Sequence, residues 1–481
     1  MFNHLEFISR HKSMLIAPAG FGKTHTIAEC LKTFEKGDKQ LILTHTHAGV
    51  ASIKEKIKNE GISSSICEVE TITSFAQKYV LAFYFKNDIP DQDDSKNYYS
   101  FIIEKAIDLF KLSPIQQIIS TTYKGLFVDE YQDCTVKQHN LILLLSELFP
   151  THILGDFLQG IFDFNGEQLV DLTDSLMMRG FIESKYELDK PQRWLNGNNA
   201  FLGADLKSLR EVLIDQKEVD FRKYNSFELK LISERDLYNP RTEYCRQIRS
   251  LMKEKSILLL HPDSTSVYPR LNIIKMFNNE FTLVESIDDK EFYVLSKECD
   301  LLSRENVRIK LFVFCKKIFN KTGVANWLNE KGLKRKIKQE DKELLEPIEA
   351  IISFLEKEYS HYKYAQLLKK LKTLPGIKCY RRELFNTLCI ALEDAENDEI
   401  SVFDSMKNKR NQTRRIGRKI YGKSIGTTLL TKGLEFDTVA IINAHKFNCP
   451  KHLYVAMTRA SKRLVIFSNK AKIHFDSDNN F

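Results

Sequence analysis

Two short motifs contain the residue types that bind a nucleoside triphosphate and hydrolyse it. The first is Ala17-Pro-Ala-Gly-Phe-Gly-Lys-Thr24, and the second is Val128-Asp-Glu-Tyr-Gln-Asp133. A glycine-rich loop followed by lysine and threonine binds phosphate through backbone N–H groups, an ammonium and a hydroxyl-bound Mg²⁺. Adjacent acids at the end of a buried strand supply a magnesium ligand and a base for water. Together the motifs predict nucleotide hydrolysis.

The first motif predicts a phosphate loop between a strand and a helix. The residues before it are apolar and predict a buried strand, and 24–33 predicts the helix that follows. Gly20 and Gly22 permit backbone angles that a side chain would block. We expect Lys23 to reach the outer phosphates and Thr24 to hold Mg²⁺. The first position of the loop, residue 17, is alanine where the motif usually has glycine.

The second motif follows an apolar run that predicts a central parallel strand, buried on both faces. We expect Asp129 to bind magnesium through water, and Glu130 to orient and deprotonate the attacking water. An exposed acidic turn is the alternative, and the phosphate loop upstream argues against it.

Composition bounds the class of protein. A length of 481 residues suggests two to four domains, and a formal charge of +8 fits a polyanion-binding protein without demanding one. Nine cysteines, with no Cys-x-x-Cys pair, predict reduced thiols in a cytoplasm. No apolar run approaches the roughly twenty residues that span a bilayer. We therefore expect a cytoplasmic protein without a membrane partner.

Further motifs follow in order along the chain. They are Thr44-His-Thr-His-Ala-Gly-Val-Ala51, Thr71-Ile-Thr-Ser-Phe75, Thr151-His-Ile-Leu-Gly-Asp156 with Gln159 after it, Thr427-Thr-Leu-Leu-Thr-Lys-Gly-Leu-Glu-Phe436, and Leu453-Tyr-Val-Ala-Met-Thr-Arg-Ala460. With the first two motifs, this series resembles superfamily-one DNA helicases of the UvrD/Rep type, over about 1–195 and 420–470. Such enzymes bind ATP between two RecA-like domains. The resemblance therefore implies an α/β fold with two RecA-like parallel-sheet P-loop NTPase cores and small, mostly helical insertions.

The resemblance also implies roles at the nucleotide. The first core would supply Lys23, Thr24, Asp129, Glu130 and Gln159, the last of which could touch a terminal phosphate. Arg193 resembles an arginine sensor at the domain junction, and Arg459 resembles the arginine finger of the second core. A guanidinium suits these positions because charge spreads over the phosphoryl oxygens in the transition state. Glu435 is similar to the family residue that touches the ribose.

The nucleobase contacts depart from the family pattern. His25 stands where relatives often have an arginine that stacks on adenine, and Gln192 aligns with the aromatic that faces it. Weak stacking on both sides predicts poor discrimination between ATP and other nucleoside triphosphates. Leu429 and Asn165 also replace a common histidine and arginine, which puts the coupling of hydrolysis to DNA movement in doubt.

Candidate DNA contacts follow from the resemblance and from charge. In relatives, segments like those beginning at positions 44 and 71 line a single-strand channel. The candidates are Thr44, His45, Thr71, Ser74, Phe162 and Phe164, with stacking and core packing both open for the two phenylalanines. Arg414 and Arg415 belong to a basic stretch with no acid from 405 to 434, which predicts phosphate contact, with a solvated helix face as the alternative.

The motif positions predict the domain organisation. The first core would comprise 1–78 and 118–195 around a small helical insertion at 79–117, and the second core 196–300 and 416–481 around a reduced helical accessory domain at 301–415. Within the accessory domain, Pro347 is expected in the first turn of a helix, where its missing N–H costs nothing.

The resemblance implies Mg²⁺-dependent hydrolysis of ATP, or of other nucleoside triphosphates, stimulated by single-stranded DNA or DNA ends, with 3′-to-5′ movement if the chain translocates. The compact form is similar to helicase components of the Gabija phage-defence system, which work beside an OLD-family nuclease. A hetero-complex with such a nuclease is therefore expected. Two alternatives stay open: a DNA-end-sensing NTPase that separates no strands, and a scaffold for a nuclease that uses nucleotide as a switch.

Overall fold

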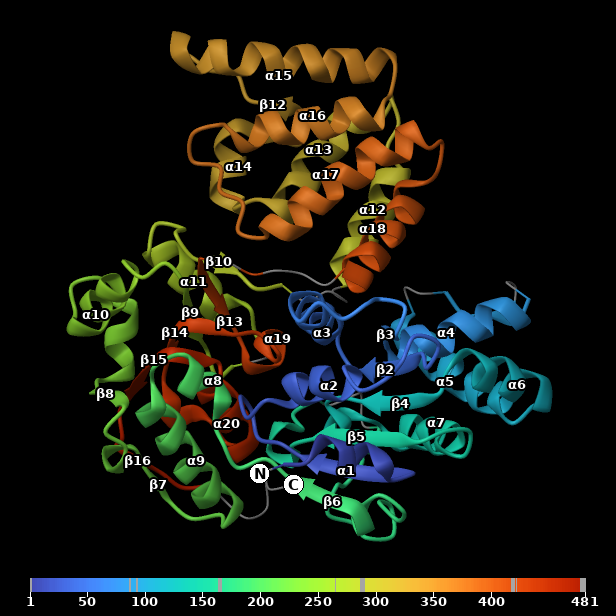
Figure 1. Cartoon of the computed structure of the whole chain (residues 1–481). Coiled ribbons are helices and arrows are strands. Elements are labelled where there is room, and N and C mark those ends of the chain that lie inside the picture. The colour runs from blue at the N-terminus through green and yellow to red at the C-terminus, as the bar shows by residue number, and fades with distance from the viewer. Residues whose placement is uncertain are drawn as a thin grey trace. The chain divides into compact units, whose positions relative to one another are not determined.

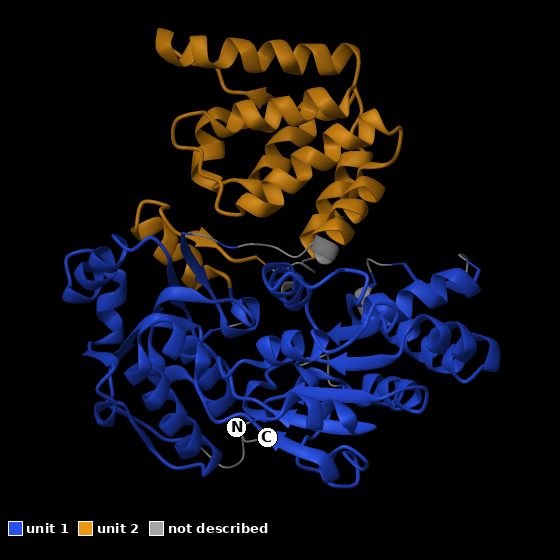
Figure 2. Ribbon diagram, viewed as in Figure 1, with its two compact units in different colours: residues 1–266, 415–481 blue, residues 267–414 orange. Residues whose placement is uncertain are grey.

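The chain forms two compact units. The computed structural model describes residues 2–85, 88–91, 94–162, 167–263, 265–285, 290–416, 420 and 422–475. Unit 1 is Met1–Ser266 with Arg415–Phe481, and unit 2 is Val267–Arg414 (Figure 2). Unit 1 therefore contains both segments that carry the motifs, although unit 2 separates them along the chain.

The first sheet of unit 1 has six parallel strands in the order β3-β2-β4-β5-β1-β6 (Figure 1). The strands are β1 Lys12–Ile16, β2 Gln40–Thr44, β3 Cys67–Thr71, β4 Gly125–Val128, β5 Thr151–Gly155 and β6 Lys185–Glu187. Every residue of β2, β4 and β5, three of the four inner strands, is buried, as expected for a parallel sheet covered on both faces.

Helices cover this sheet on both faces. They are α1 His4–Ser9, α2 Lys23–Leu31, α3 His47–Asn59, α4 Ile72–Phe83, α5 Ser95–Phe110, α6 Ser113–Thr122 and α7 Val136–Ser146. Successive side chains of a strand point to opposite faces. Leu41 and Leu43 accordingly pack in a cluster with α4, α5 and α7, whereas Ile42 packs in another with α1, α2 and α3.

The second sheet of unit 1 is assembled from both segments of the chain. Its strands β8 Phe227–Leu231, β9 Ile257–Leu260, β13 Lys423–Gly426, β14 Phe436–Ile441 and β15 Ala460–Ser468 run parallel in the order β13-β9-β14-β15-β8. In Figure 1 the red strands β14 and β15 lie between the green strands β9 and β8. The accompanying helices are α8 Gln192–Asn196, α9 Ala200–Ile214, α10 Glu243–Leu251, α19 Thr428–Thr431 and α20 Pro450–Met457, and β7 Val219–Asp220 pairs with β16 Lys472–Ile473.

Unit 2 is mostly helical. Its elements are α11 Tyr268–Met276, β10 Thr282–Leu283, α12 Lys290–Asp300, α13 Val307–Ile318, α14 Lys321–Trp327, β11 Leu328–Asn329, β12 Gly332–Leu333, α15 Gln339–Lys357, α16 His361–Lys372, α17 Arg382–Asn397 and α18 Val402–Ile416. The apolar faces of α12 to α18 share one core. Unit 2 begins at Val267, earlier than the accessory domain predicted from 301.

The structure confirms the predicted α/β class with two parallel sheets and helical insertions. One local prediction was wrong: α15 begins at Gln339, so Pro347 lies inside the helix rather than in its first turn. The helix extends past the proline because Leu345 and Ile348 on either side of it are buried in the core of unit 2. None of the helices among the described residues is long and apolar enough to cross a membrane.

Candidate nucleotide-binding site

The phosphate loop connects β1 to α2 and depends on two glycines. Gly20 has φ +76° and Gly22 has φ +105°, a left-handed backbone that favours glycine. A Cβ atom on Gly20 would also lie 2.7 Å from the ring of Trp194. Trp194 is fully buried, and its indole N–H donates to the carbonyl oxygen of Ala460 at 2.9 Å. The tryptophan therefore contacts both the phosphate loop and the segment that carries Arg459.

The lysine of the loop is buried and turned inward. Lys23 is 8% exposed, and its Nζ donates to the carbonyl oxygen of Ala17 at 3.1 Å. The same Nζ lies 3.6 Å from Glu130 Oε1. A buried ammonium beside backbone N–H groups at a helix start favours an anion, and Thr24 is the next residue of the same helix.

The two acids of the second motif follow β4. Asp129 is buried, and its Oδ1 accepts the N–H of Glu130 at 2.9 Å, while Glu130 itself has φ +56°. Burial raises the pKa of Asp129 to about 7, and the charge of Glu130 adds to the effect. Burial also opposes ionisation of Glu130, but the positive charges of Lys23 and Lys432 outweigh it and lower the pKa of Glu130 to about 2. Glu130 is therefore ionised at neutral pH, as a base must be, and Asp129 is a carboxyl that a cation would favour in its charged form.

Amide side chains join the ends of β4 and β5. Gln132 Nε2 donates to the Glu130 carboxylate, and Gln132 Oε1 accepts the backbone N–H of Asp156 at 2.9 Å. Gln159, in the 3₁₀ turn Phe157–Gln159, donates from Nε2 to Asp156 Oδ2 at 3.1 Å. Asp156 and Gln132 thus connect Gln159, the predicted phosphate contact, to Glu130, the predicted base, through hydrogen bonds.

A lysine from the second sheet completes this network. Lys432 is buried, and its Nζ donates both to the Asp133 carboxylate and to the carbonyl oxygen of Gln159. Burial raises the pKa of Asp133 to about 7, although Lys432 opposes the rise. Sequence reasoning did not single out Lys432, Gln132 or Asp133, although all three lie inside the motifs. Their signal was only that they are polar residues inside two of the motifs.

The two predicted arginines meet at the junction of the sheets. Arg193 on α8 donates from Nη1 to the carbonyl oxygen of Thr458 at 2.6 Å, and from Nη2 to the Glu435 carboxylate. Arg459 is 3% exposed and donates to the carbonyl oxygens of Val455 at 3.0 Å and of Leu434 at 3.2 Å.

Charge links these arginines to the base. Burial lowers the pKa of Arg459 to about 10, and the charge of Arg193 contributes to this shift. The charge of Arg459 in turn helps to lower the pKa of Glu130. The structure therefore brings residues from both sheets into one electrostatic site, with Glu435 bound to Arg193 in this conformation.

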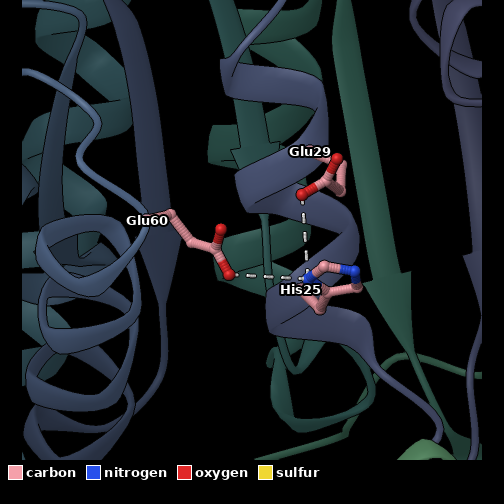
Figure 3. Close-up of side chains that lie close together, drawn as sticks. All are labelled: His25, Glu29 and Glu60. Carbon is pink, nitrogen blue, oxygen red and sulfur yellow. Dashed lines mark ion pairs between the residues drawn. The ribbon is translucent and has the colours of Figure 1, made fainter.

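His25 and Gln192, the two residues predicted to contact the nucleobase, lie beside the phosphate loop. Gln192 Cγ would lie 3.5 Å from a Cβ atom on Gly22. His25 is half exposed, and its Nδ1 lies 3.9 Å from Glu29 and 4.0 Å from Glu60 (Figure 3). These three side chains are close enough to share a metal ion. Lys32, however, donates to both acids at 2.6 and 2.9 Å, so we assign an ion-pair cluster.

The predicted DNA contacts have diverse surroundings. Thr44 is fully buried at the end of β2, and burial lowers the pKa of His45 to about 3. Thr71 caps α4 by accepting the N–H of Ser74 at 3.0 Å. Phe162 is half-buried, and Lys432 Nζ lies 4.7 Å from its ring centroid. Contact of Thr44 with DNA would require its side chain to be uncovered, whereas His45 is partly exposed.

Other predicted DNA residues fall outside the described part of the chain. Phe164 and the side chains of Arg414 and Arg415 belong to this group. Earlier in the same basic stretch, Lys409 pairs with Asp394, and the buried Arg410 pairs with Glu383. These two cations are thus already neutralised within unit 2.

Parts of the chain are similar to known proteins. Residues 5–165 match the AAA domain family. The exonuclease/helicase protein RexA of Lactococcus lactis subsp. cremoris strain MG1363 and an ATP-dependent helicase/nuclease component of strain SK11 are each 26% identical over 148 residues. These matches cover 30% of this chain and 12% of the relatives. The crystal structure of Pif1 helicase from Candida albicans matches 98% of this chain and 95% of its own at 12% identity, with a TM-score of 0.38, a similarity too low to support an assignment of function.

Proposed function

We propose that this chain is a Mg²⁺-dependent ATPase of the superfamily-one helicase type, active also on other nucleoside triphosphates. The observation that supports it most is the convergence of Lys23 and Glu130 from the first sheet with Arg459 from the second. The two cores would comprise 1–78 with 118–195, and 196–300 with 416–481. Hydrolysis would take place between them.

The residues present fit the substrate and the ion. Thr24 and Asp129 would hold Mg²⁺, which when bound neutralises phosphate charge. Lys23, released from the Ala17 carbonyl, would bind the outer phosphates, together with Gln159. Arg193 and Arg459 would stabilise the charge that develops on the phosphoryl oxygens. Glu130, ionised at neutral pH, would accept the proton of the attacking water.

Glu130→Gln tests the proposal directly. The substitution removes the base but keeps an acceptor for Gln132, so we expect hydrolysis to fall by roughly 10²–10⁴-fold with nucleotide binding retained. Steady-state turnover and binding of a fluorescent nucleotide measure the two properties. The exposed Glu35 provides a matched control, Glu35→Gln, that should leave turnover unchanged. Undiminished hydrolysis by Glu130→Gln would contradict the proposal.

We propose single-stranded DNA or DNA ends as the partner that stimulates hydrolysis. The names of matching relatives contain the words helicase and nuclease, and the chain carries a net charge of +8. A strand-displacement assay run beside a hydrolysis assay distinguishes a helicase from a DNA-end-sensing NTPase. Hydrolysis stimulated by DNA without strand separation would favour the second activity.

We further propose a role in phage defence beside an OLD-family nuclease, as in Gabija systems, and the support is the short length of the chain, 481 residues. Plaque assays on cells that express this chain together with an OLD-family nuclease would test this role. Loss of protection with Glu130→Gln is the expected result. Full protection by that variant would instead support a nucleotide-switched scaffold for the nuclease.

A further inference from the structure

Helix α9 contributes one arginine to the interior of the candidate site. Arg210 Nη2 lies 2.8 Å from Asp156 Oδ1, at the carboxyl end of β5. Arg210 lies outside every motif from which nucleotide binding was predicted. The contact therefore joins α9, which carries none of the motifs, to the segment 155–159 that contains Asp156 and Gln159.

The charges of this pair depend on each other. Asp156 is fully buried, and the Arg210 side chain is 13% exposed. Burial opposes the charge of Arg210, but Asp156 and the hydroxyl of Tyr454 raise its pKa. A buried carboxylate that loses its cation becomes an uncompensated charge, which is strongly unfavourable. Arg210 is therefore the cation that the structure pairs with the buried Asp156 side chain.

Asp156 in turn contacts both glutamines of the site. Its Oδ2 accepts Gln159 Nε2 at 3.1 Å, so the carboxylate fixes the direction of that amide. Its backbone N–H donates to Gln132 Oε1 at 2.9 Å, and Gln132 Nε2 donates to Glu130. A continuous chain of hydrogen bonds thus runs from Arg210 to the predicted phosphate contact and to the predicted base.

We propose that Arg210 is a positioning residue for hydrolysis, which acts through the Asp156 carboxylate on Gln159. This inference rests on the function proposed above. A shift of α9 would move the guanidinium relative to Asp156 and release Gln159, so the helix can adjust the hydrolytic residues without touching the nucleotide. The expected signature is a loss in kcat with little change in KM.

A purely structural role is the competing explanation. The Arg210 guanidinium carbon lies 5.3 Å from the ring centroid of Phe157, and both residues line a cavity of about 540 Å³ behind the phosphate loop. Packing and stability alone could therefore require the arginine. A double-mutant cycle with Gln159 separates the two roles, because only a residue that acts through Gln159 loses its effect when Gln159 is absent.

The experiment measures DNA-stimulated hydrolysis by Arg210→Met, Gln159→Ala and the double variant. We expect Arg210→Met to lower kcat by roughly 10- to 100-fold with KM for ATP changed less than about twofold, and the double variant to match Gln159→Ala. Arg210→Lys retains the charge opposite Asp156 and should recover most of kcat. Losses that multiply in the double variant, or wild-type kcat in Arg210→Met, would overturn the inference.

Lys207→Met is the matched control. Lys207 lies one turn earlier on α9, lines the same cavity and donates to the carbonyl oxygen of Asp189 rather than to Asp156. We expect its kcat to equal that of the wild type. A loss as large as that of Arg210→Met would overturn the inference, because it would show that any change on α9 has the same effect.

Nucleotide binding distinguishes failure of this inference from failure of the proposed function. A wild-type chain that binds nucleotide but does not hydrolyse it would defeat the proposed function. The inference is then tested by the preference for a non-hydrolysable ATP analogue over ADP, which Arg210→Met and Gln159→Ala should reduce by the same factor. An unchanged preference in Arg210→Met would overturn the inference, and a chain that bound neither nucleotide would overturn both.

Discussion

Lys432 illustrates how one side chain connects the two sheets of unit 1. Its ammonium is bound to Asp133 after β4 and to the carbonyl oxygen of Gln159 after β5. Because both partners lie far away in the sequence, spacing alone could not indicate them. Lys23, Asp129 and Glu130 were predictable for the opposite reason, since a local strand-loop-helix motif determines their positions.

Lys432→Met should destabilise the chain in a manner that depends on pH. Burial raises the pKa of Asp133 from 3.8 to about 7. The folded state therefore binds the proton more tightly than the unfolded state, and the free energy of unfolding of the wild type falls as pH rises from about 4 to 7. Without the lysine charge the pKa of Asp133 rises further. The penalty of the substitution should then grow above pH 7, by up to about 1.4 kcal/mol per pH unit.

Denaturant unfolding between pH 6 and pH 9 measures this effect. The matched comparison repeats Lys432→Met in an Asp133→Asn background, where the carboxyl is absent and the penalty should show no trend with pH. An equal penalty at pH 6 and pH 9 in the Asp133 background would contradict the assignment of this ion pair.

His25 and Gln192 predict the nucleotide preference of the site. Gln192 has no aromatic ring, and His25, which replaces the arginine common in the family, lies beside Glu29 and Glu60, so we expect weak stacking on the nucleobase. We expect kcat/KM for ATP, GTP and CTP to agree within about tenfold, which corresponds to about 1.4 kcal/mol of discrimination. A much larger preference for ATP would show that other residues read the base.

At the scale of elements, the strands of unit 1 were the most predictable part of the fold. The apolar run before Asp129 was predicted as a central strand buried on both faces, and every residue of β4 is buried, because a short apolar run in a parallel sheet has few alternatives. Helix boundaries in unit 2 were less predictable. There, burial of side chains outweighed the local cost of Pro347, a balance that depends on residues distant in sequence.

Pro347→Ala should stabilise unit 2. Inside α15 the proline cannot donate the backbone bond to residue 343, and its side chain is exposed, so alanine restores the bond without loss of packing. We expect a gain of roughly 1–3 kcal/mol, since proline inside a helix costs about 3 and the more flexible unfolded chain offsets part of this. Thermal unfolding of the full chain measures it, with the exposed Glu346→Ala as the control. An unchanged or lower unfolding temperature would be the contrary result.

At the scale of the whole molecule, a net charge of +8 makes DNA binding sensitive to salt if the proposed partner is right. Replacing Arg414 and Arg415 by glutamine should lower the slope of log affinity against log salt by about 1.4 for single-stranded DNA, because each phosphate contact contributes about 0.7. Fluorescence anisotropy between about 50 and 300 mM salt measures the slope. Glutamine at the exposed Arg335 and Lys338 is the control pair, and equal slopes for both pairs would contradict phosphate contact.

The order of the strands in the second sheet has a consequence for biosynthesis. β14 and β15 lie between β9 and β8, yet they follow unit 2 along the chain. On the ribosome the first sheet can form early, whereas β8 and β9 must wait for their neighbours to leave the exit tunnel. In a nascent chain the phosphate loop with Lys23 would thus fold long before Arg459 is synthesised. During this interval the edges of β8 and β9 would be unpaired and available for chaperones to bind.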